Sequence, residues 1–272
     1  MKQLFSIVLS LVLLVLSVYS QGTFLPTSIV NGTWVNGSVT AFNSPGALAT
    51  NALVFYYKMN EASGSLVDSS TNYLTGYPTG SISYTQLGVV GTAIQGSRSV
   101  TTYVTNLYSG MASNSNWTIS FWMKIGASAN IEVPIAARVY SGGNANGWVI
   151  ANSSGNIGGN GMWFVSGTNG TYGTLPFTTS AFFDNTWKHV ACVWSNDIVF
   201  AYTNGVLAAA SSSFATVKTT SVPIYPMLMN DGFAVGTTYG WSGYLDEVGY
   251  WATNLTPAQI QYLAATNPFS KF

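Results

Sequence analysis

Charged side chains are scarce in this chain of 272 residues. Only 6% of the residues are Asp, Glu, Lys or Arg, and the formal net charge is zero. Proteins that bind nucleic acid use a basic surface to neutralise phosphates, so the composition argues against nucleic acid as a partner. The surface must be neutral and rich in hydroxyl and amide groups. Without charge repulsion, such a surface favours an assembly, a glycan coat or a setting in which modest solubility suffices.

Cysteine and histidine each occur once, as Cys192 and His189. A single cysteine excludes an intramolecular disulfide, and zinc sites built on several His or Cys ligands are excluded as well. A Ser-His-Asp or Cys-His catalytic site would have to use His189. Both residues lie in an alternating apolar run, so we interpret Cys192 as a small buried residue and His189 as a structural one.

The chain has one long apolar run, residues 4–18, which follows Lys2. The run is shorter than the about 20 residues of a membrane span, and Val18-Tyr19-Ser20 suits signal peptidase. We therefore predict a signal peptide over residues 1–20 and a secreted or cell-surface protein. An uncleaved anchor is the alternative, and a membrane is involved only in that case. Residues 21–50 are rich in Gly, Ser, Thr and Asn and are predicted to form a linker or a loosely docked segment.

Aromatic residues, by contrast, make up 14% of the chain, and there are 28 glycines. Residues 187–208 contain two alternating apolar runs and end in an Asn204-Gly205 turn, the strongest short hairpin signal. His189, Ala191 and Val193 point to one face of the first run, whereas Val190 and Cys192 point to the other. Because both faces carry bulk, the pattern predicts stacked antiparallel sheets.

Several motifs in order carry a family resemblance. They are WKHVA (187–191), AYTNG (201–205), WSGYLDEVGYW (241–251), NLTPAQIQYL (254–263), ALVFYYKM (52–59), VDSS (67–70), GVVGTAI (88–94) and WTISFWMK (117–124). Together they resemble the laminin-G-like jelly roll domain of the concanavalin A-like lectin/glucanase superfamily. The resemblance implies an all-β, antiparallel two-sheet jelly-roll sandwich over residues 51–267, with a short C-terminal helix. Members of the family range from lectins and adhesion modules to enzyme appendages and structural proteins.

The expected helix begins at Thr256. Thr256 is suited to the N-cap, Pro257 to the first helical position and Gln259 to the third, which together make a capping box. Ile260 and Leu263 form a short apolar stripe. We expect this helix to lie across one end of the sandwich.

Catalysis by paired carboxylates is not expected. The glucanase branch of the superfamily carries a Glu-x-Asp-x-Glu motif, which is absent here. The close pair Asp246 and Glu247 should point to opposite faces of a strand. We therefore predict that the protein is not an enzyme, and a polysaccharide hydrolase with scattered carboxylates stays open as an alternative.

One structural calcium ion is a candidate cofactor. Asp68 and Asp246 match positions that often support an ion in similar proteins, and calcium prefers such carboxylate oxygens. The alternative is that Asp68 caps its own turn and that Asp246 is held by buried amides.

Sugar binding generally needs an exposed aromatic platform with amides nearby. Our candidates for the carbohydrate-binding site are Tyr172, Tyr239, Trp163 and Asn169. Trp163 fits a core strand equally well. We expect Trp148 and Trp241 to be core residues.

Asn-x-Ser/Thr sequons offer a possible glycan coat. The candidates are Asn31, Asn36, Asn152, Asn169 and Asn254, whereas Asn116 opens a core strand and is a poor acceptor.

The sequence thus predicts a secreted or cell-surface, non-enzymatic module that binds a glycan or an extracellular surface protein and is carbohydrate-binding or adhesive. A structural protein that self-associates is the first alternative, because fold alone does not choose a function.

Overall fold

We describe a computed structural model of the chain. It describes residues 48–99, 101–111, 116–126, 131–141, 144–154, 160–168, 171–212, 214, 226–230 and 239–265. The chain divides into two units, residues 1–44 and 45–272, and all described residues belong to the second. The predicted signal peptide over 1–20, the predicted linker up to residue 47, and the candidates Asn31, Asn36 and Asn169 lie outside the described residues.

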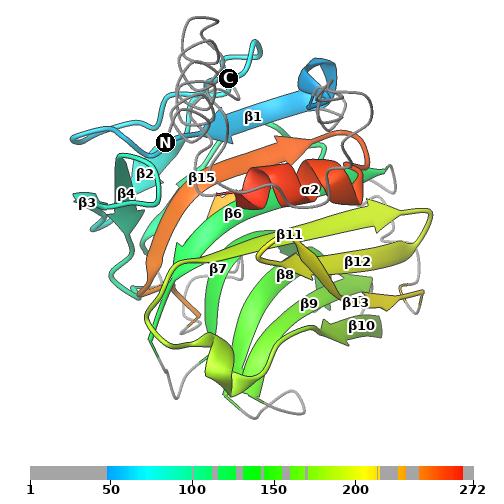
Figure 1. Ribbon diagram of the computed structural model, residues 1–272. Coiled ribbons are helices and arrows are strands. Elements are labelled where there is room, and N and C mark those ends of the chain that lie inside the picture. The colour runs from blue at the N-terminus through cyan, green and yellow to red at the C-terminus, as the bar shows by residue number, and fades with distance from the viewer. Residues whose placement is uncertain are drawn as a thin grey trace, which may run out of the picture. The chain divides into compact units, whose positions relative to one another are not determined.

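The described elements are strands with two short 3-10 helices and one α-helix (Figure 1). In chain order they are η1 (Thr50–Ala52), β1 (Leu53–Tyr57), β2 (Tyr77–Thr79), β3 (Ser83–Leu87), β4 (Thr92–Gln95), β5 (Tyr103–Thr105), β6 (Trp117–Lys124), β7 (Glu132–Ser141), β8 (Asn144–Ser154), β9 (Asn160–Thr168), β10 (Thr171–Pro176), η2 (Ser180–Phe182), β11 (Lys188–Ser195), β12 (Ile198–Thr203), β13 (Val206–Ser211), β14 (Met227–Leu228), β15 (Tyr244–Trp251) and α2 (Pro257–Ala264).

The strands form two antiparallel sheets, which confirms the predicted jelly-roll sandwich. The eight-stranded sheet has the order β13-β12-β11-β6-β15-β4-β3, with β1 also paired to β15. The seven-stranded sheet has the order β10-β9-β8-β7-β14-β5-β2. Figure 1 shows the two sheets as curved layers, with β11 to β13 in front of β8 to β10.

Aromatic rings from both sheets fill the space between them. Trp117 of β6 stacks on Trp148 of β8, with ring centroids 4.9 Å apart, and lies 5.9 Å from Trp194 of β11. Cys192 and Trp194 point into this core, whereas Ala191 and Val193 belong to a second cluster on the outer face of the same sheet. The alternation predicted for residues 187–194 is therefore confirmed.

The Asn204-Gly205 turn joins β12 to β13, and both residues have positive φ, 49° and 79°. These values fit the type I′ turn that the dipeptide predicts. The Asn204 side chain accepts a hydrogen bond from the His189 backbone N–H at 3.0 Å. A second turn of this kind, Asn196-Asp197, joins β11 to β12 with φ of 48° and 65°, and its sequence gave no prediction.

The α-helix has the predicted capping box, in which the Gln259 N–H donates to the Thr256 side chain at 3.3 Å and Pro257 stands first. Its position differs from our expectation. Ile260 and Leu263 pack against Ala191 and Val193 on the outer face of the eight-stranded sheet, not across the end of the sandwich. The apolar outer residues of β11 explain this, because they need a cover. None of the helices in the described part of the chain has the length and hydropathy of a membrane span.

Candidate functional site

A cleft of about 360 Å³ opens where five strands begin or end. Its walls come from the ends of β4 and β6, the starts of β7 and β15, and the segment before β11. The lining residues are Gln95, Arg98, Ile125, Gly126, Glu132, Asn185, Ser242, Gly243 and Tyr244. Because most of these positions flank regular strands, the sheets hold the site while its surface is formed by connecting segments.

The backbone on both sides of the cleft is fixed by pairing that continues past the strands. The Gly96 N–H donates to the Gly243 carbonyl at 3.1 Å, and the Arg98 N–H donates to the Trp241 carbonyl at 2.9 Å. A Cβ at position 96 would lie 2.1 Å from the Trp241 oxygen, so only glycine permits this approach. The Asn185 N–H is likewise held by the Ile125 carbonyl at 3.0 Å.

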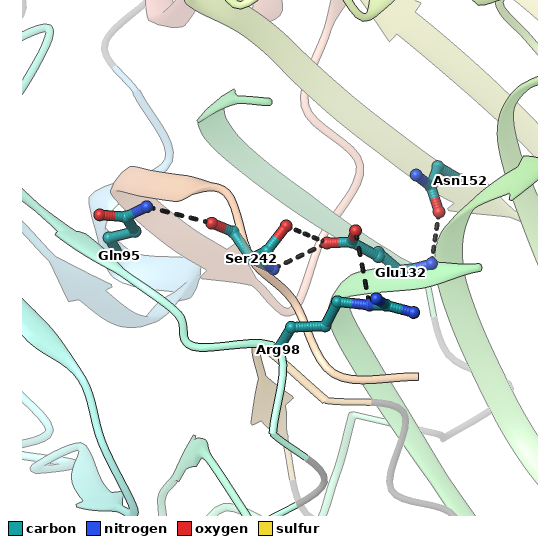
Figure 2. A network of polar contacts seen from close by, with 5 residues as sticks. All are labelled: Gln95, Arg98, Glu132, Asn152 and Ser242. Atoms are coloured by element: carbon teal, nitrogen blue, oxygen red, sulfur yellow. Dashed lines mark hydrogen bonds and ion pairs between the residues drawn. The ribbon is translucent and has the colours of Figure 1, made fainter. Parts of the chain in front are cut away.

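A buried carboxylate that lines the cleft, Glu132, lies at the centre of a network of polar contacts (Figure 2). Glu132 is 2% exposed, and its Oε2 accepts hydrogen bonds from the Ser242 backbone N–H at 2.7 Å and from the Ser242 hydroxyl at 2.6 Å. Its Oε1 lies 3.8 Å from Arg98 Nε. Gln95 donates to the Ser242 carbonyl at 3.3 Å, and the Asn152 side chain accepts from the Glu132 N–H. Such partners are what a buried charge requires.

Two residues of the cleft adopt the left-handed backbone region. Arg98 has φ of 58° and Asn185 has φ of 59°. Asparagine tolerates this region, but for arginine it costs about 1 kcal/mol or more. The fold therefore imposes the position of Arg98 against its own backbone preference.

Aromatic rings and a lysine stand beside the cleft on the outer face of the eight-stranded sheet. The Lys124 ammonium lies 4.1 Å from the ring centroid of Tyr244 and 5.3 Å from that of Trp187. The two rings meet edge to face at 6.2 Å, and all three side chains are half-buried. These cation–π contacts orient Tyr244, which also lines the cleft.

The arrangement combines amide, hydroxyl and guanidinium donors with a half-buried aromatic ring. A site of this kind suits a small polar ligand that has one flat apolar face, because the ring packs on that face while the donors fix its orientation. Among the described lining residues, Glu132 is the only carboxylate.

The predicted carbohydrate candidates lie elsewhere. Trp163 is 7% exposed in an apolar cluster on the outer face of the seven-stranded sheet, and the half-buried Tyr239 packs against the same cluster. Tyr172 is 50% exposed on β10, opposite Gly167, so it shares that outer face. The structure thus places Trp163 and Tyr239 together and Tyr172 on the same face, while none of the three lines the cleft.

The residues assigned to the core are buried as expected. Trp148 and Trp241 are 1% and 0% exposed. His189 is 1% exposed, and its Nε2 lies 2.8 Å from the Ser120 hydroxyl. Burial raises the pKa of the Cys192 thiol, which keeps it protonated.

The two calcium candidates lie at separate turns. Asp68 accepts four hydrogen bonds: from the backbone N–H groups of Tyr56, Ser70 and Leu74, each at 2.8 Å, and from the Ser70 hydroxyl at 2.7 Å. It therefore caps its own turn, as the alternative interpretation holds. No group of three His, Cys, Asp or Glu residues placed to hold a metal occurs among the residues described. The calcium ion stays a prediction.

Asp246 is fully buried, and its Oδ2 accepts from the Val89 and Val90 N–H groups at 2.7 and 3.1 Å. Its Oδ1 has no well-formed hydrogen bond within the described residues. Burial raises the pKa of Asp246 to about 8; the neighbouring charge of Glu247 adds to the rise, whereas the Val90 N–H opposes it.

The strand is irregular at this acid pair. The register of β15 shifts between Asp246 and Gly249, and Glu247 has φ of 52°. Strict alternation between the two acids, which we expected, does not apply across such a bulge. Burial raises the pKa of Tyr56, which donates a hydrogen bond to Glu247, and the charges of Glu247 and Asp246 add to this rise.

The sequons within the described residues differ in exposure. Asn152 is 1% exposed and its Oδ1 accepts the Glu132 N–H, so the folded protein does not present this amide to solvent. Asn254 is half-buried. Asn116 is exposed, and its side chain accepts from the Asn196 N–H at 3.2 Å.

Sequence reasoning missed the cleft altogether. Arg98, Glu132 and Ser242 lie far apart in the chain, and no motif joins them. One signal was present, since Glu132 is a rare acid at the head of an apolar strand, IEVPIAA, where a buried charge needs a partner.

The family comparison agrees with this fold. The laminin G family model described as the concanavalin A-like lectin/glucanases superfamily matches residues 95–261, more than half of the chain. The chain therefore belongs to this family. No curated protein matches the chain in sequence.

Solved structures show the same fold at low sequence identity. Domain 4 of AbnA, a GH43 extracellular arabinanase from Geobacillus stearothermophilus solved in complex with arabinotriose, is 22% identical with a TM-score of 0.59, covering 78% of this chain and 98% of that domain. The receptor binding domain of botulinum neurotoxin C/D mosaic serotype is 17% identical with a TM-score of 0.60, covering 79% of this chain and 51% of its own. Trypanosoma rangeli sialidase is 11% identical with a TM-score of 0.57, covering 79% of this chain and 32% of the enzyme.

Proposed function

We propose that this protein is a non-catalytic carbohydrate-binding module of the cell exterior and that the cleft beside Tyr244 binds the glycan. The observation that carries the proposal is the combination, in one cleft, of an oriented aromatic ring with the amide of Gln95 and the guanidinium of Arg98. Pyranose and furanose rings present hydroxyl groups at their edge and C–H groups on their face, so they complement such a site. The likeness to an arabinanase domain solved with arabinotriose supports the same class of ligand.

The small number of carboxylates in the described lining of the cleft favours glycan binding without hydrolysis. Glycoside hydrolysis requires two carboxyl groups about 5 to 10 Å apart across the sugar. The described lining of the cleft has one, Glu132, and both of its oxygens already contact Ser242 or Arg98. A carboxylate held in this way supports the architecture of the site.

A glycan array followed by calorimetry tests the proposal, with arabinotriose among the ligands. Removing the ring with Tyr244→Ala should weaken binding by about tenfold or more, and Gln95→Ala should weaken it severalfold, as for lost stacking and one lost hydrogen bond. Tyr73→Ala is the matched control, because Tyr73 is 82% exposed and lies outside the cleft. Thermal unfolding of each variant separates lost binding from lost folding.

Other outcomes assign the function elsewhere. If Tyr172→Ala or Tyr239→Ala abolishes binding while Tyr244→Ala does not, the glycan binds on the outer face of the seven-stranded sheet. Turnover of a polysaccharide by the purified protein would make it a hydrolase.

One observation favours self-association as a second candidate function. The edge strand β13 has the sequence VLAAAS, without charge or proline, and Val206 and Leu207 are 66% and 50% exposed. Natural edge strands are usually protected by charged residues or proline, and β13 has neither. Stable oligomers together with no glycan binding would favour this candidate over the first.

A further inference from the structure

The Arg98 guanidinium has N–H donors that no described residue accepts. It lines the cleft, and its side chain is 37% exposed. The Glu132 oxygen closest to it is 3.8 Å from Nε, which is too far for a hydrogen bond. Nε itself is buried and donates no hydrogen bond to any described residue. A guanidinium is always charged and presents five N–H donors in a planar fork. The donors of Arg98 that no described residue accepts can therefore bind an acceptor group of a ligand in the cleft.

The main chain of Arg98 is held beside the cleft. Arg98 is anchored by its N–H to the Trp241 carbonyl, and Gly240 approaches so closely that a Cβ there would lie 2.8 Å from the Arg98 carbonyl carbon. Together with the left-handed φ of Arg98, these contacts fix its Cα beside the cleft, and the Glu132 carboxylate 3.8 Å from Nε holds the side chain on that side.

In the described part of the chain, Arg98 and Glu132 line the cleft and Lys124 contacts its lining residue Tyr244. A further charged pair, Asp184 and Lys188, lies on either side of Asn185 in the sequence. Asp184 forms an ion pair with Lys188 at 2.8 Å, and Glu132 is buried against Arg98 and Ser242. Lys124, which contacts the rings of Tyr244 and Trp187, has no carboxylate partner among the described residues. It therefore adds a positive charge beside the cleft.

From these observations we infer that the ligand of the cleft is an acidic glycan, a sugar that carries a carboxylate or sulfate group, and that Arg98 binds this group. The inference rests on the proposed function and narrows its ligand class. Carboxylate and sulfate oxygens match the guanidinium fork, and a charge-assisted pair is stronger than a bond to a hydroxyl. Lys124 contributes attraction at longer range and orients the ring on which the sugar packs.

Calorimetry on the full chain tests the inference with three matched ligands: trigalacturonate, galactotriose as its neutral counterpart, and a sulfated galactan oligosaccharide. The acidic ligands should bind about tenfold or more tightly than galactotriose, as for one charge-assisted pair. Raising the salt concentration should reduce this preference, because dissolved ions screen the attraction between the half-buried Lys124 and the acidic group. Whichever of the two acidic ligands binds more tightly identifies the preferred group as carboxylate or sulfate.

Two substitutions locate the effect. Arg98→Gln should weaken both ligands but the acidic one more, so that the preference for the acidic ligand over galactotriose falls from about tenfold to about twofold or less, because Gln keeps a neutral hydrogen-bond donor and lacks the charge. Lys124→Gln should give a loss of about threefold and a weaker salt dependence. Lys58→Gln removes a half-buried positive charge outside the cleft and is the control for net charge. Thermal unfolding confirms that each variant is folded.

The outcomes separate this inference from the proposed function. If neutral and acidic ligands bind equally and Tyr244→Ala abolishes both, the glycan-binding function stands and the acidic ligand class is wrong. Unchanged binding of trigalacturonate and of the sulfated ligand by Arg98→Gln overturns the role of Arg98. If a panel of neutral and acidic glycans gives no binding at all, the proposed function and this inference both fail.

Discussion

Asp68 and Asp246 hold two turns of the same sandwich, and they do so with different numbers of donors. Asp68 accepts four hydrogen bonds, three of them from backbone N–H groups, and is 6% exposed. Asp246 is fully buried but accepts from two N–H groups through one oxygen. Burial disfavours the charged carboxylate, and hydrogen bonds to it favour it. At Asp246 burial dominates, because its pKa rises to about 8.

Two acids with the same predicted role therefore respond to different perturbations. The turn at Asp68 depends on an acceptor that several donors share. The turn at Asp246 depends on the close approach of residues 88–90 and on the protonation of one carboxyl. Four experiments, in descending order of expected effect, test this contrast.

Removing the acceptor at Asp68 should have the largest effect. Asp68→Ala leaves the buried N–H of Tyr56 and the donors of Ser70 and Leu74 without a partner, so we expect a loss of about 3 kcal/mol or more in the free energy of unfolding. Urea denaturation measures it. Asp197→Asn is the control, since Asp197 also lies in a turn and asparagine tolerates its φ of 65°. A loss at Asp68 no larger than that of the control would contradict the shared-acceptor role.

The close approach at Asp246 can be broken from the opposite side of the turn. A Cβ at Gly88 would lie 2.7 Å from the Asp246 Oδ2 and 2.7 Å from the Thr92 carbonyl oxygen. Gly88→Ala should therefore cost about 2 kcal/mol by overpacking. At Gly64 a Cβ would meet nothing within 4 Å, so Gly64→Ala carries only the strain of its φ of 78° and should cost about 1 kcal/mol. Equal losses in the same denaturation assay would show that the turn yields freely.

Protonation of Asp246 should make stability depend on pH. The pKa is about 8 in the folded protein against an ordinary value of 3.8, so the folded state binds the proton more tightly than the unfolded chain. The associated stability is fully present below about pH 4 and is lost as the pH rises towards about 8.

Asp246→Asn removes this titration and keeps an oxygen for the Val89 and Val90 N–H groups. Relative to the wild type, the variant should gain about 1 kcal/mol or more between pH values near 5 and near 9. Chemical denaturation at both pH values gives the difference, in which all other titrating groups cancel. Parallel curves for the two proteins would refute the raised pKa.

Calcium should give the smallest effect. The oxygens of Asp68 already accept four chain donors, so an ion is more easily accommodated at the Asp246 Oδ1, and only when that carboxyl is ionised. We expect calcium to raise the midpoint of thermal unfolding by about 2 °C at most near pH 9 and by less near pH 6. Asp246→Asn should remove the shift. Identical midpoints with calcium and with chelator at both pH values would contradict the prediction of a bound calcium ion.

Local sequence patterns predicted much of this fold. The Asn204-Gly205 turn, the alternation through Cys192 and the capping box at Thr256 each depend on residues close in sequence, and each is confirmed. The family resemblance gave the two-sheet sandwich, which is also confirmed.

Features that depend on distant residues were missed or misplaced. The cleft requires Arg98, Glu132 and Ser242 to meet, and no local pattern encodes their approach. The bulge at Glu247 breaks the alternation expected from the sequence, since a bulge inserts one residue without a sequence marker. The helix after Thr256 was assigned the right cap but the wrong surface, because its own stripe does not identify the strand that it covers.

The position of β15 has a consequence for how the chain is made. β15 pairs with β1, β4 and β6, so residues 53–57, 94–95 and 118–124 all depend on residues 244–251 for a neighbour. Synthesis proceeds at about 5 to 20 residues per second, and contacts of such sequence separation form late. Until Trp251 has left the ribosome, the nascent chain carries open strand edges. It is therefore expected to be a client of chaperones throughout most of its translation.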